Sequence, residues 1–323
     1  MNNAELNPIK DRSMVESAVV GNKGVLRAQL IDGFKRDKFI IFCFSLLLVY
    51  LLASLFAPVI APFNPYDLSQ VDILDAELPP LWEEGGDPRF LLGTDAQGRD
   101  MFSTILYGTR ISLLIGVGAV LLQTLLGVAI GLTAGYFGGK VDSLLMRIAD
   151  IQLSFSTLMV AIIAAAVFRA AFGEELYGEL AVVILILVIG TVEWPQFART
   201  VRASVLAEKQ KEYVEAARVM GFGSSRIMWR HILPNTLSPL LVIFTLQIAN
   251  AIIAEASLSF LGLGMPVSEP SLGALISSGF EYIFSESWWI AVIPGVVLVL
   301  LILVINLLGD WLRDMLNPKF YRM

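Results

Sequence analysis

Long apolar runs separated by polar segments dominate the pattern of this chain. Six of the runs are predicted to form membrane-spanning helices, each of which needs about 20 predominantly apolar residues. The runs cover residues 39–57, 111–137, 151–168, 180–192 (continuing towards 199), 236–254 and 287–308. The pattern therefore predicts an all-α fold, a polytopic membrane helix bundle with six transmembrane helices.

The polar segments divide the chain into parts. These are an N-terminal tail (1–38), the first transmembrane helix (39–57), a long loop (58–110), a core of five helices (111–312) and a C-terminal tail (313–323). Within the long loop, residues 91–113 are predicted to form an interfacial helix, because Thr94 and Gln97 have capping-box spacing and an apolar face follows them. Residues 140–150 are predicted to form a polar turn, and residues 169–179 a short loop.

The distribution of charge predicts an orientation. Lys and Arg crowd the two tails and the loop 193–235, whereas the loops 58–110, 170–179 and 255–286 are acidic. An excess of Lys and Arg marks the cytoplasmic loops of membrane proteins. Both termini and the loop 193–235 are therefore predicted to be cytoplasmic, with the acidic loops on the periplasmic side.

Composition excludes several functional classes. The chain of 323 residues is 56% hydrophobic and only 16% charged, which argues against a soluble domain. Its basic residues are scattered over several loops, which argues against nucleic-acid binding. With one Cys, Cys43, and one His, the chain can form neither an internal disulfide nor a Cys/His metal cluster.

A Gly-Lys pair at the end of the second predicted span is not a phosphate-binding loop. Ala134 stands where the first Gly of such a loop would be, and Val141 replaces the Ser or Thr that would hold magnesium. No other nucleotide-binding pattern occurs in the chain, so any ATP is expected on another subunit.

A polar, glycine-broken segment lies between the fourth and fifth apolar runs. Residues 212–220 are predicted to form a helix. Gly221 and Gly223 are predicted to end it, because Gly reaches positive φ without a steric penalty. A second short helix is predicted to follow, capped by Ser224 or Ser225.

This segment resembles the signature loop of ABC-importer permeases, in which EAA and a Gly precede an I-x-L-P string. The matching residues are Glu215, Ala216, Ala217, Gly221, Leu233 and Pro234, whereas His231 stands at the Ile position. In that family the loop forms a coupling helix that docks in a groove of a cytoplasmic ATPase. The alternative is an ordinary amphipathic connector between two membrane helices.

The resemblance implies a role for each matching residue. Glu215 would make a polar contact to the ATPase, and Ala216 and Ala217 would allow close approach. Gly221 would make the turn, and Leu233 with Pro234 would fix the second helix.

Two further strings resemble the dipeptide, oligopeptide and nickel branch of these permeases. One covers residues 255–264, and the other lies in the predicted interfacial helix, where a capped entry helix with solvated charges is the alternative. The matching residues of the latter are Leu92, Gly93, Thr94, Asp95, Gly98, Arg99, Asp100, Tyr107, Gly108 and Arg110. The branch carries peptides, nickel complexes, glutathione and opines or sugars, so the sequence does not name the solute.

The resemblance also implies a type I ABC importer permease fold in the bacterial inner membrane, and a set of partners. A second permease subunit would complete the pathway as a heterodimer. Two cytoplasmic ATPase subunits would bind ATP and Mg and switch the bundle between inward-open and outward-open states. A periplasmic binding protein would deliver the solute, and this chain would be a non-catalytic subunit without a cofactor or metal of its own.

Polar residues inside the predicted spans are candidates for lining the pathway. Gln247 and Asn250 share a face of the fifth span, and Gln123 lies in the second. Polar groups at membrane depth are costly, so they face the bundle interior or a water-filled path; hydrogen bonds between helices are the alternative use. A stripe of small residues in the second span predicts close helix packing, at Gly127, Gly131 and Gly135.

Two other functional classes fit the sequence less well. A secondary transporter or channel that needs no ATPase should carry ion-coupling carboxylates within its spans, whereas Glu193 and Glu255 lie near predicted helix ends. An intramembrane enzyme would need paired catalytic residues at membrane depth, and the sequence offers none.

Overall fold

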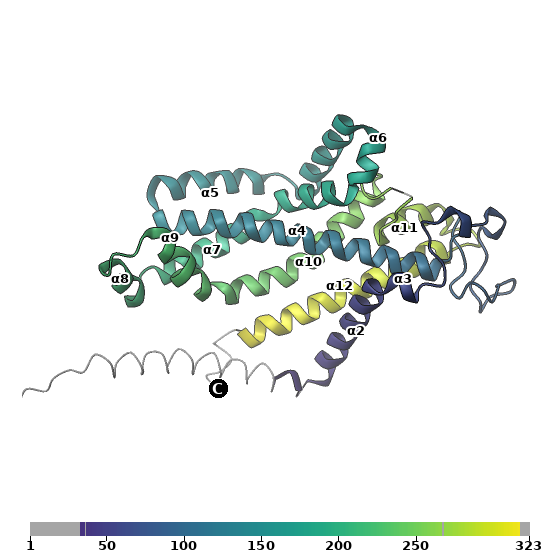
Figure 1. Cartoon of the computed structure of the whole chain (residues 1–323), viewed down its shortest axis with the longest axis horizontal. Helices are drawn as coiled ribbons and strands as arrows, with labels where there is room; N and C mark the ends of the chain where they lie inside the picture. The colour runs from purple at the N-terminus through teal and green to yellow at the C-terminus, as the bar shows by residue number, and fades with distance from the viewer. Residues whose placement is uncertain (1–32, 36, 267, 317–323) are drawn as a thin grey trace, which may run out of the picture.

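The computed structural model describes residues 33–35, 37–266 and 268–316 (Figure 1). Residues 1–32 and 317–323, which make up most of the two predicted tails, lie outside the described residues. The described part is built from helices and holds no β-strand, so the predicted all-α class is confirmed.

The longer helices are α2 (Lys38–Leu55), α4 (Met101–Phe137), α5 (Gly139–Ser154), α6 (Thr157–Val192), α7 (Trp194–Glu208), α10 (Leu237–Phe260) and α12 (Trp289–Leu316). The shorter ones are α3 (Ala57–Ile60), η1 (Leu68–Gln70), η2 (Ile73–Asp75), α8 (Glu212–Val219), α9 (Ser224–Arg226), η3 (Ile227–Ile232), η4 (Leu233–Asn235), α11 (Leu272–Gly279) and η5 (Phe280–Tyr282).

Four helices of the described chain are each long and apolar enough to cross a membrane, namely α2, α4, α10 and α12. Two further spans are bent pairs of helices. In one, α5 meets the first part of α6 at 89°; in the other, the second part of α6 meets α7 at 45°. Counting each bent pair as one span gives up to six, which agrees with the predicted number.

The predicted interfacial helix begins only at Met101, and its later part forms one continuous helix, α4, with the predicted second span. Asp100 caps it, with its Oδ2 accepting the N–H of Ser103 at 2.9 Å. Thr94, the predicted cap, instead accepts the N–H of Leu78 at 2.8 Å. The capping-box prediction was wrong because residues 94–100 form a turn, closed by a bridge between Thr94 and Asp100, before the helix begins.

The predicted polar turn at 140–150 is helical and belongs to α5. Its acidic side chains bind arginines of α7: Arg202 Nη2 donates to Asp142 Oδ2 at 2.6 Å, and Arg199 pairs with Asp150. These ion pairs between α5 and α7 let a polar segment remain helical. The predicted third span, 151–168, is accordingly interrupted by the break between α5 and α6.

Two other predicted boundaries differ from the structure. The predicted loop 169–179 is helical, with a kink at Gly173, where φ is +76°. The fifth helix, α10, continues to Phe260 instead of ending at 254. Glu255 therefore lies inside a helix rather than after its end.

Helix α4 is the centre of the bundle and contacts α6, α7 and α10. Its contact with α7 runs along the glycine stripe Gly127, Gly131 and Gly135. A Cβ atom added to Gly127 would lie 2.3 Å from Cβ of Phe197, and one added to Gly131 would lie 2.5 Å from the carbonyl oxygen of Ala198. The missing side chains therefore allow the two helix backbones to approach closely.

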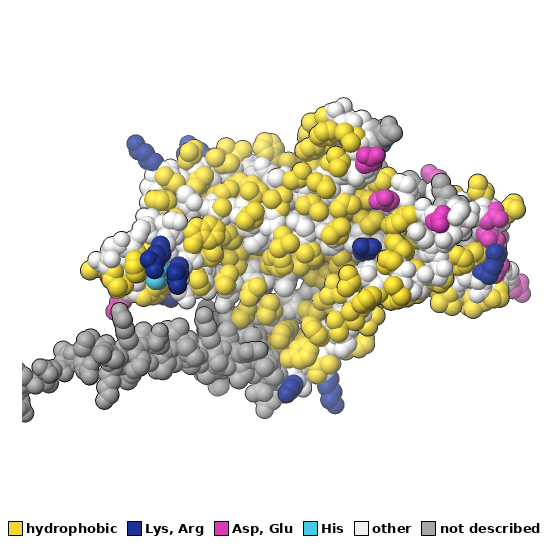
Figure 2. Space-filling view, in the orientation of Figure 1, with side chains coloured by type: hydrophobic (Ala, Val, Ile, Leu, Met, Phe, Trp, Pro, Cys, Tyr) yellow, Lys and Arg dark blue, Asp and Glu magenta, His cyan; other side chains and the backbone are white. Residues whose placement is uncertain are grey.

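The two ends of the bundle differ. We name residues 209–236 the α8 end, and residues 61–100 with 261–266 and 268–288 the loop end. The two lie at opposite ends of the long axis in Figure 1. Figure 2 shows Lys, Arg and His side chains gathered around the α8 end, whereas Asp and Glu gather towards the loop end. Apolar side chains cover most of the surface between them.

Candidate functional site

Helix α8 ends in a hydrogen-bonded glycine turn. The N–H of Gly221 donates to the carbonyl of Arg218 at 2.9 Å, and the N–H of Phe222 donates to that of Ala217 at 3.1 Å. This pair of bonds is a Schellman motif, which places a left-handed residue just after the helix. Gly221 has the required φ of +78°, whereas Gly223, with φ of −64°, is extended and does not need to be glycine.

The residues of α8 that match the family pattern lie on two different faces of the helix. Val214 and Ala217 are buried against the bundle, whereas Glu215 and Ala216 are exposed. Ala217 was predicted to allow close approach of a partner, but it faces the interior of this chain. An approaching surface would therefore meet Ala216, with Val219 (88% exposed) one turn further along the helix.

The segment after Gly221 is less regular than the predicted second helix. Neither predicted serine caps α9, whose N-cap is Gly223. The chain continues as a π-helical turn, η3, and a 3-10 turn, η4. Leu233 packs against the core, and Pro234 is exposed in η4.

An aromatic stack supports this irregular segment. The rings of Phe222 and His231 lie 5.8 Å apart and nearly parallel, and the guanidinium of Arg226 lies 4.4 Å from the Phe222 ring centroid. Nε2 of His231 is buried and accepts or donates no hydrogen bond within the described chain. His231, which departs from the family pattern, thus acts as a flat packing surface beneath the turn.

Several polar contacts fasten the α8 end to the bundle. The Tyr213 hydroxyl donates to Glu208 Oε2 of α7 at 2.6 Å and accepts from Asn235 Nδ2 at 3.2 Å. Burial, and secondarily the bond to Glu208, raises the pKa of the Tyr213 hydroxyl. Lys209 Nζ donates to the carbonyl of Gly135 of α4 at 2.8 Å. The Tyr213 bond thus ties α8 to the end of α7, and the Lys209 bond ties the end of α7 to α4.

A cluster of amide side chains joins α4, α7 and α10 inside the bundle. Asn250 Nδ2 donates to Gln247 Oε1 at 2.6 Å, and Gln247 Nε2 lies 3.5 Å from Gln123 Oε1. Gln247 Nε2 also donates to Glu193 Oε2 at 3.0 Å. The structure therefore brings the three predicted polar residues together and adds Glu193, which the sequence placed only near a helix end.

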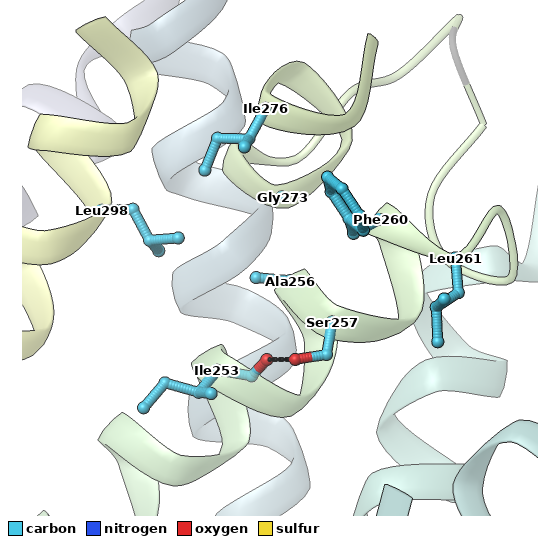
Figure 3. A pocket seen from close by; sticks show the side chains of 8 residues that line it. All are labelled: Ile253, Ala256, Ser257, Phe260, Leu261, Gly273, Ile276 and Leu298. Carbon is cyan, nitrogen blue, oxygen red and sulfur yellow. Dashed lines mark hydrogen bonds between the residues drawn. The ribbon is translucent and has the colours of Figure 1, made fainter. Parts of the chain in front are cut away.

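The members of this cluster differ in how deeply their side chains are buried. Gln123 and Gln247 are buried and bridge helices, as in the alternative that the sequence left open. Asn250 is exposed, on a face of α10 that continues through Ile253 and Phe260. An open apolar groove of about 400 Å³ begins at Ile253 on this face, and Figure 3 shows Ile253 and Phe260 around it with Ile276 of α11 and Leu298 of α12.

A second buried polar group was missed by the sequence reasoning. Glu255 is fully buried within α10. Its Oε1 accepts hydrogen bonds from Ser259 at 2.7 Å and Ser271 at 2.6 Å, and its Oε2 accepts one from Ser112 at 3.1 Å. The four-residue spacing to Ser259 is a signal in the sequence, but the other two partners come from α4 and the start of α11.

The loop end is held by ion pairs and turns. Arg99 Nε donates to Asp95 Oδ2 at 2.7 Å, and both side chains are buried, which is a structural role for two residues of the family string. At the surface, hydrogen bonds from Arg89 hold the pKa of the Asp87 carboxyl below its usual range. Within the described residues, no group of three His, Cys, Asp or Glu side chains is arranged to hold a metal ion.

These features define a class of membrane transport subunit. The family model described as "binding-protein-dependent transport system inner membrane component" matches residues 127–322. The model described as "N-terminal TM domain of oligopeptide transport permease C" matches residues 28–80. The chain belongs to this family of binding-protein-dependent ABC importer permeases, and is a non-catalytic, multi-pass inner membrane subunit.

Several relatives are similar over most of their length. The dipeptide transport system permease protein DppC of Haemophilus influenzae is 39% identical over 286 residues, which cover 88% of this chain and 92% of that protein. The protein of the same name from Escherichia coli is 40% identical over 286 residues, covering 88% and 91%. The di/tripeptide transport system permease protein DppC of Pseudomonas aeruginosa is 39% identical over 276 residues, covering 85% and 86%.

A solved structure confirms the fold. An inward-facing structure of the MetNI methionine ABC transporter matches 67% of this chain and 98% of the compared chain, with a TM-score of 0.53 and 20% identity. The type I importer permease fold is therefore shared, and at this identity the likeness concerns the fold alone.

Proposed function

We propose that this chain and a second permease subunit together form the membrane pathway of an importer for peptides or related small solutes. Two cytoplasmic ATPase subunits bind ATP and Mg and drive the pathway, and a periplasmic binding protein delivers the solute. Family membership supports the importer class, and the dipeptide and di/tripeptide names of three relatives support the class of solute.

The observation that carries this proposal is the construction of the α8 end. Glu215 and Ala216 stand on the exposed face of a short helix, which is ended by the left-handed Gly221. The Tyr213 hydroxyl ties the same helix to α7. Closure of the ATPase subunits would therefore displace α8 and, through it, the helices that surround the polar cluster.

The charge distribution supports an orientation with α8 in the cytoplasm. Lys and Arg gather around the α8 end in Figure 2, and acidic residues gather at the loop end. Basic loops remain on the cytoplasmic side of the membrane. The loop end then faces the periplasm, where the binding protein docks.

The exposed face of α10 supports the placement of the second permease subunit. Asn250 is polar and exposed on a helix whose other exposed residues are mainly apolar, such as Ile253. Because a polar side chain is costly against lipid, we place this face towards the second subunit and the pathway.

The decisive experiment is affinity purification of the tagged chain in mild detergent, followed by reconstitution into liposomes. We expect a second permease and ATPase subunits to co-purify and to take up peptide when ATP and the binding protein are supplied. Purification of the chain without any ATPase, with solute uptake that needs no ATP, would replace this proposal by a secondary transporter.

Gly221→Asp is predicted to abolish this uptake while the chain still inserts into the membrane. The substitution strains a turn that requires φ of +78° and places a charge on the exposed docking surface. Gly223→Ala is the matched control, because Gly223 is extended and an added Cβ meets nothing within 4 Å. Normal uptake by a stably inserted Gly221→Asp chain would contradict the role of the turn.

A further inference from the structure

Glu193 occupies the 45° bend where α6 gives way to α7. Its Oε2 accepts hydrogen bonds from Gln196 Nε2 at 2.9 Å and Gln247 Nε2 at 3.0 Å. Its Oε1 accepts no hydrogen bond from the described residues. Two amides thus fix one carboxyl oxygen and leave the other available to a donor from outside the chain.

No basic residue of the described chain forms an ion pair with Glu193. The two nearest arginines along α7 are Arg199 and Arg202, which are bound by Asp150 and Asp142 of α5. The positive charges of α7 are therefore already neutralised. Among the described residues, Glu193 is therefore a carboxyl group without a basic partner, and ionisable side chains in membrane helices are costly and a mark of function.

The carboxyl group is also partly accessible from outside the chain. Glu193 is only half-buried, and Gln247 connects it to the exposed Asn250. Along α7, Glu193 lies six residues before Arg199, or about 9 Å at 1.5 Å per residue. The cluster therefore lies where the apolar part of the bent span meets its charged part, which leads towards α8.

We propose that Glu193, positioned by Gln196 and Gln247, binds the protonated amino group of the cargo as the cargo leaves the pathway. An ammonium group offers up to three N–H donors and a positive charge, which match a half-satisfied carboxyl beside an exposed amide. Small peptides carry such a group at neutral pH. This inference rests on the proposed function, because it takes the exposed face of α10 to line the pathway.

The test measures the local charge with a cysteine reporter at Asn250. In the purified complex, Cys43 is replaced by Ser, and Asn250→Cys is reacted with a cationic and an anionic thiosulfonate reagent. Each rate is divided by that reagent's rate with a free thiol. The same pair of rates is then measured after Glu193→Gln, which removes the charge and keeps the size of the side chain.

We expect the cationic reagent to react faster than the anionic one, and the ratio of the two rates to fall about tenfold on Glu193→Gln, as expected for a unit charge at close range. Trialanine in excess should slow the cationic reaction when Glu193 is present, and its N-acetyl derivative should not. Any of three results would overturn the proposed site. These are a rate ratio that Glu193→Gln leaves unchanged, equal protection by the two peptides, and a thiol that reacts with neither reagent.

The outcome is separable from that of the proposed function. If the complex takes up peptide when ATP is supplied but Glu193→Gln leaves the rate ratio unchanged, the importer proposal stands and the proposed Glu193 site is wrong. A chain that purifies without ATPase rejects the importer whatever the ratio. Glu193→Asp, which retains the charge, should keep the ratio above that of Glu193→Gln if charge rather than shape is responsible.

Discussion

At the residue scale, Glu255 shows how one buried carboxyl group joins three helices. Three serine hydroxyls from α4, α10 and the start of α11 donate to it. Ser271 also caps α11 by accepting the N–H of Ala274 at 3.1 Å. The carboxyl therefore fixes the position of α11 against the two longer helices.

Glu255→Ala is predicted to destabilise the chain by about 3 kcal/mol or more, because it leaves three buried hydroxyls without their acceptor and opens a cavity. Thermal unfolding of the detergent-purified chain would measure the loss. Ser257→Ala is the control on the same helix, because its hydroxyl donates only to the backbone carbonyl of Ile253 in that helix. This substitution should change the stability by less than about 0.5 kcal/mol. Equal melting of the two variants would contradict this account.

At the scale of elements, the close contact of α4 and α7 depends on the absence of side chains. The nearest neighbour of an added Cβ at Gly131 is a backbone atom, which cannot turn aside as a side chain can. The same face of α4 carries Gly127 and Gly135 against the next turns of α7. The bent span formed by α6 and α7 is thus held to α4 along α7, its charged half.

Gly131→Ala is predicted to cost about 1–3 kcal/mol of stability, as overpacking does in other tightly packed cores. Gly295→Ala in α12 is the matched control, since an added Cβ there meets nothing within 4 Å. The control should be neutral or gain about 0.5–1 kcal/mol from the better helix propensity of Ala. Denaturation of the two variants in the same detergent compares them directly, and a stable Gly131→Ala chain would argue against the close contact.

The elements also show what the sequence could predict. The apolar runs, the glycine stripe and the turn at Gly221 are local patterns, and each has a local physical cause. Helix α5 could not be recognised, because its Asp142 and Asp150 are satisfied by arginines about 50 to 60 residues away. The partners of Glu255 and the link from Glu193 to Gln247 likewise arise only when distant helices pack together.

At the scale of the whole molecule, the separation of charge between the two ends predicts the topology. Val219 at the α8 end and Leu74 at the loop end are 88% and 90% exposed, so a cysteine at either position is accessible in cells that express the chain without the ATPase subunits, which would otherwise cover Val219. With Cys43 replaced by Ser, a membrane-impermeant maleimide should label Leu74→Cys in cells with a permeabilised outer membrane. It should label Val219→Cys only after the inner membrane is opened. The reverse pattern would invert the proposed orientation.

The exposed amide of Asn250 has a consequence for the cell's control of subunit numbers. A copy of this chain without its second subunit would present that amide, and the open groove further along the same face of α10, to lipid instead of to a protein surface. The orphan is then less well accommodated than the assembled subunit. We therefore expect the orphan to be lost from the membrane faster than the assembled subunit, so that the amount of this chain follows the amount of its partner.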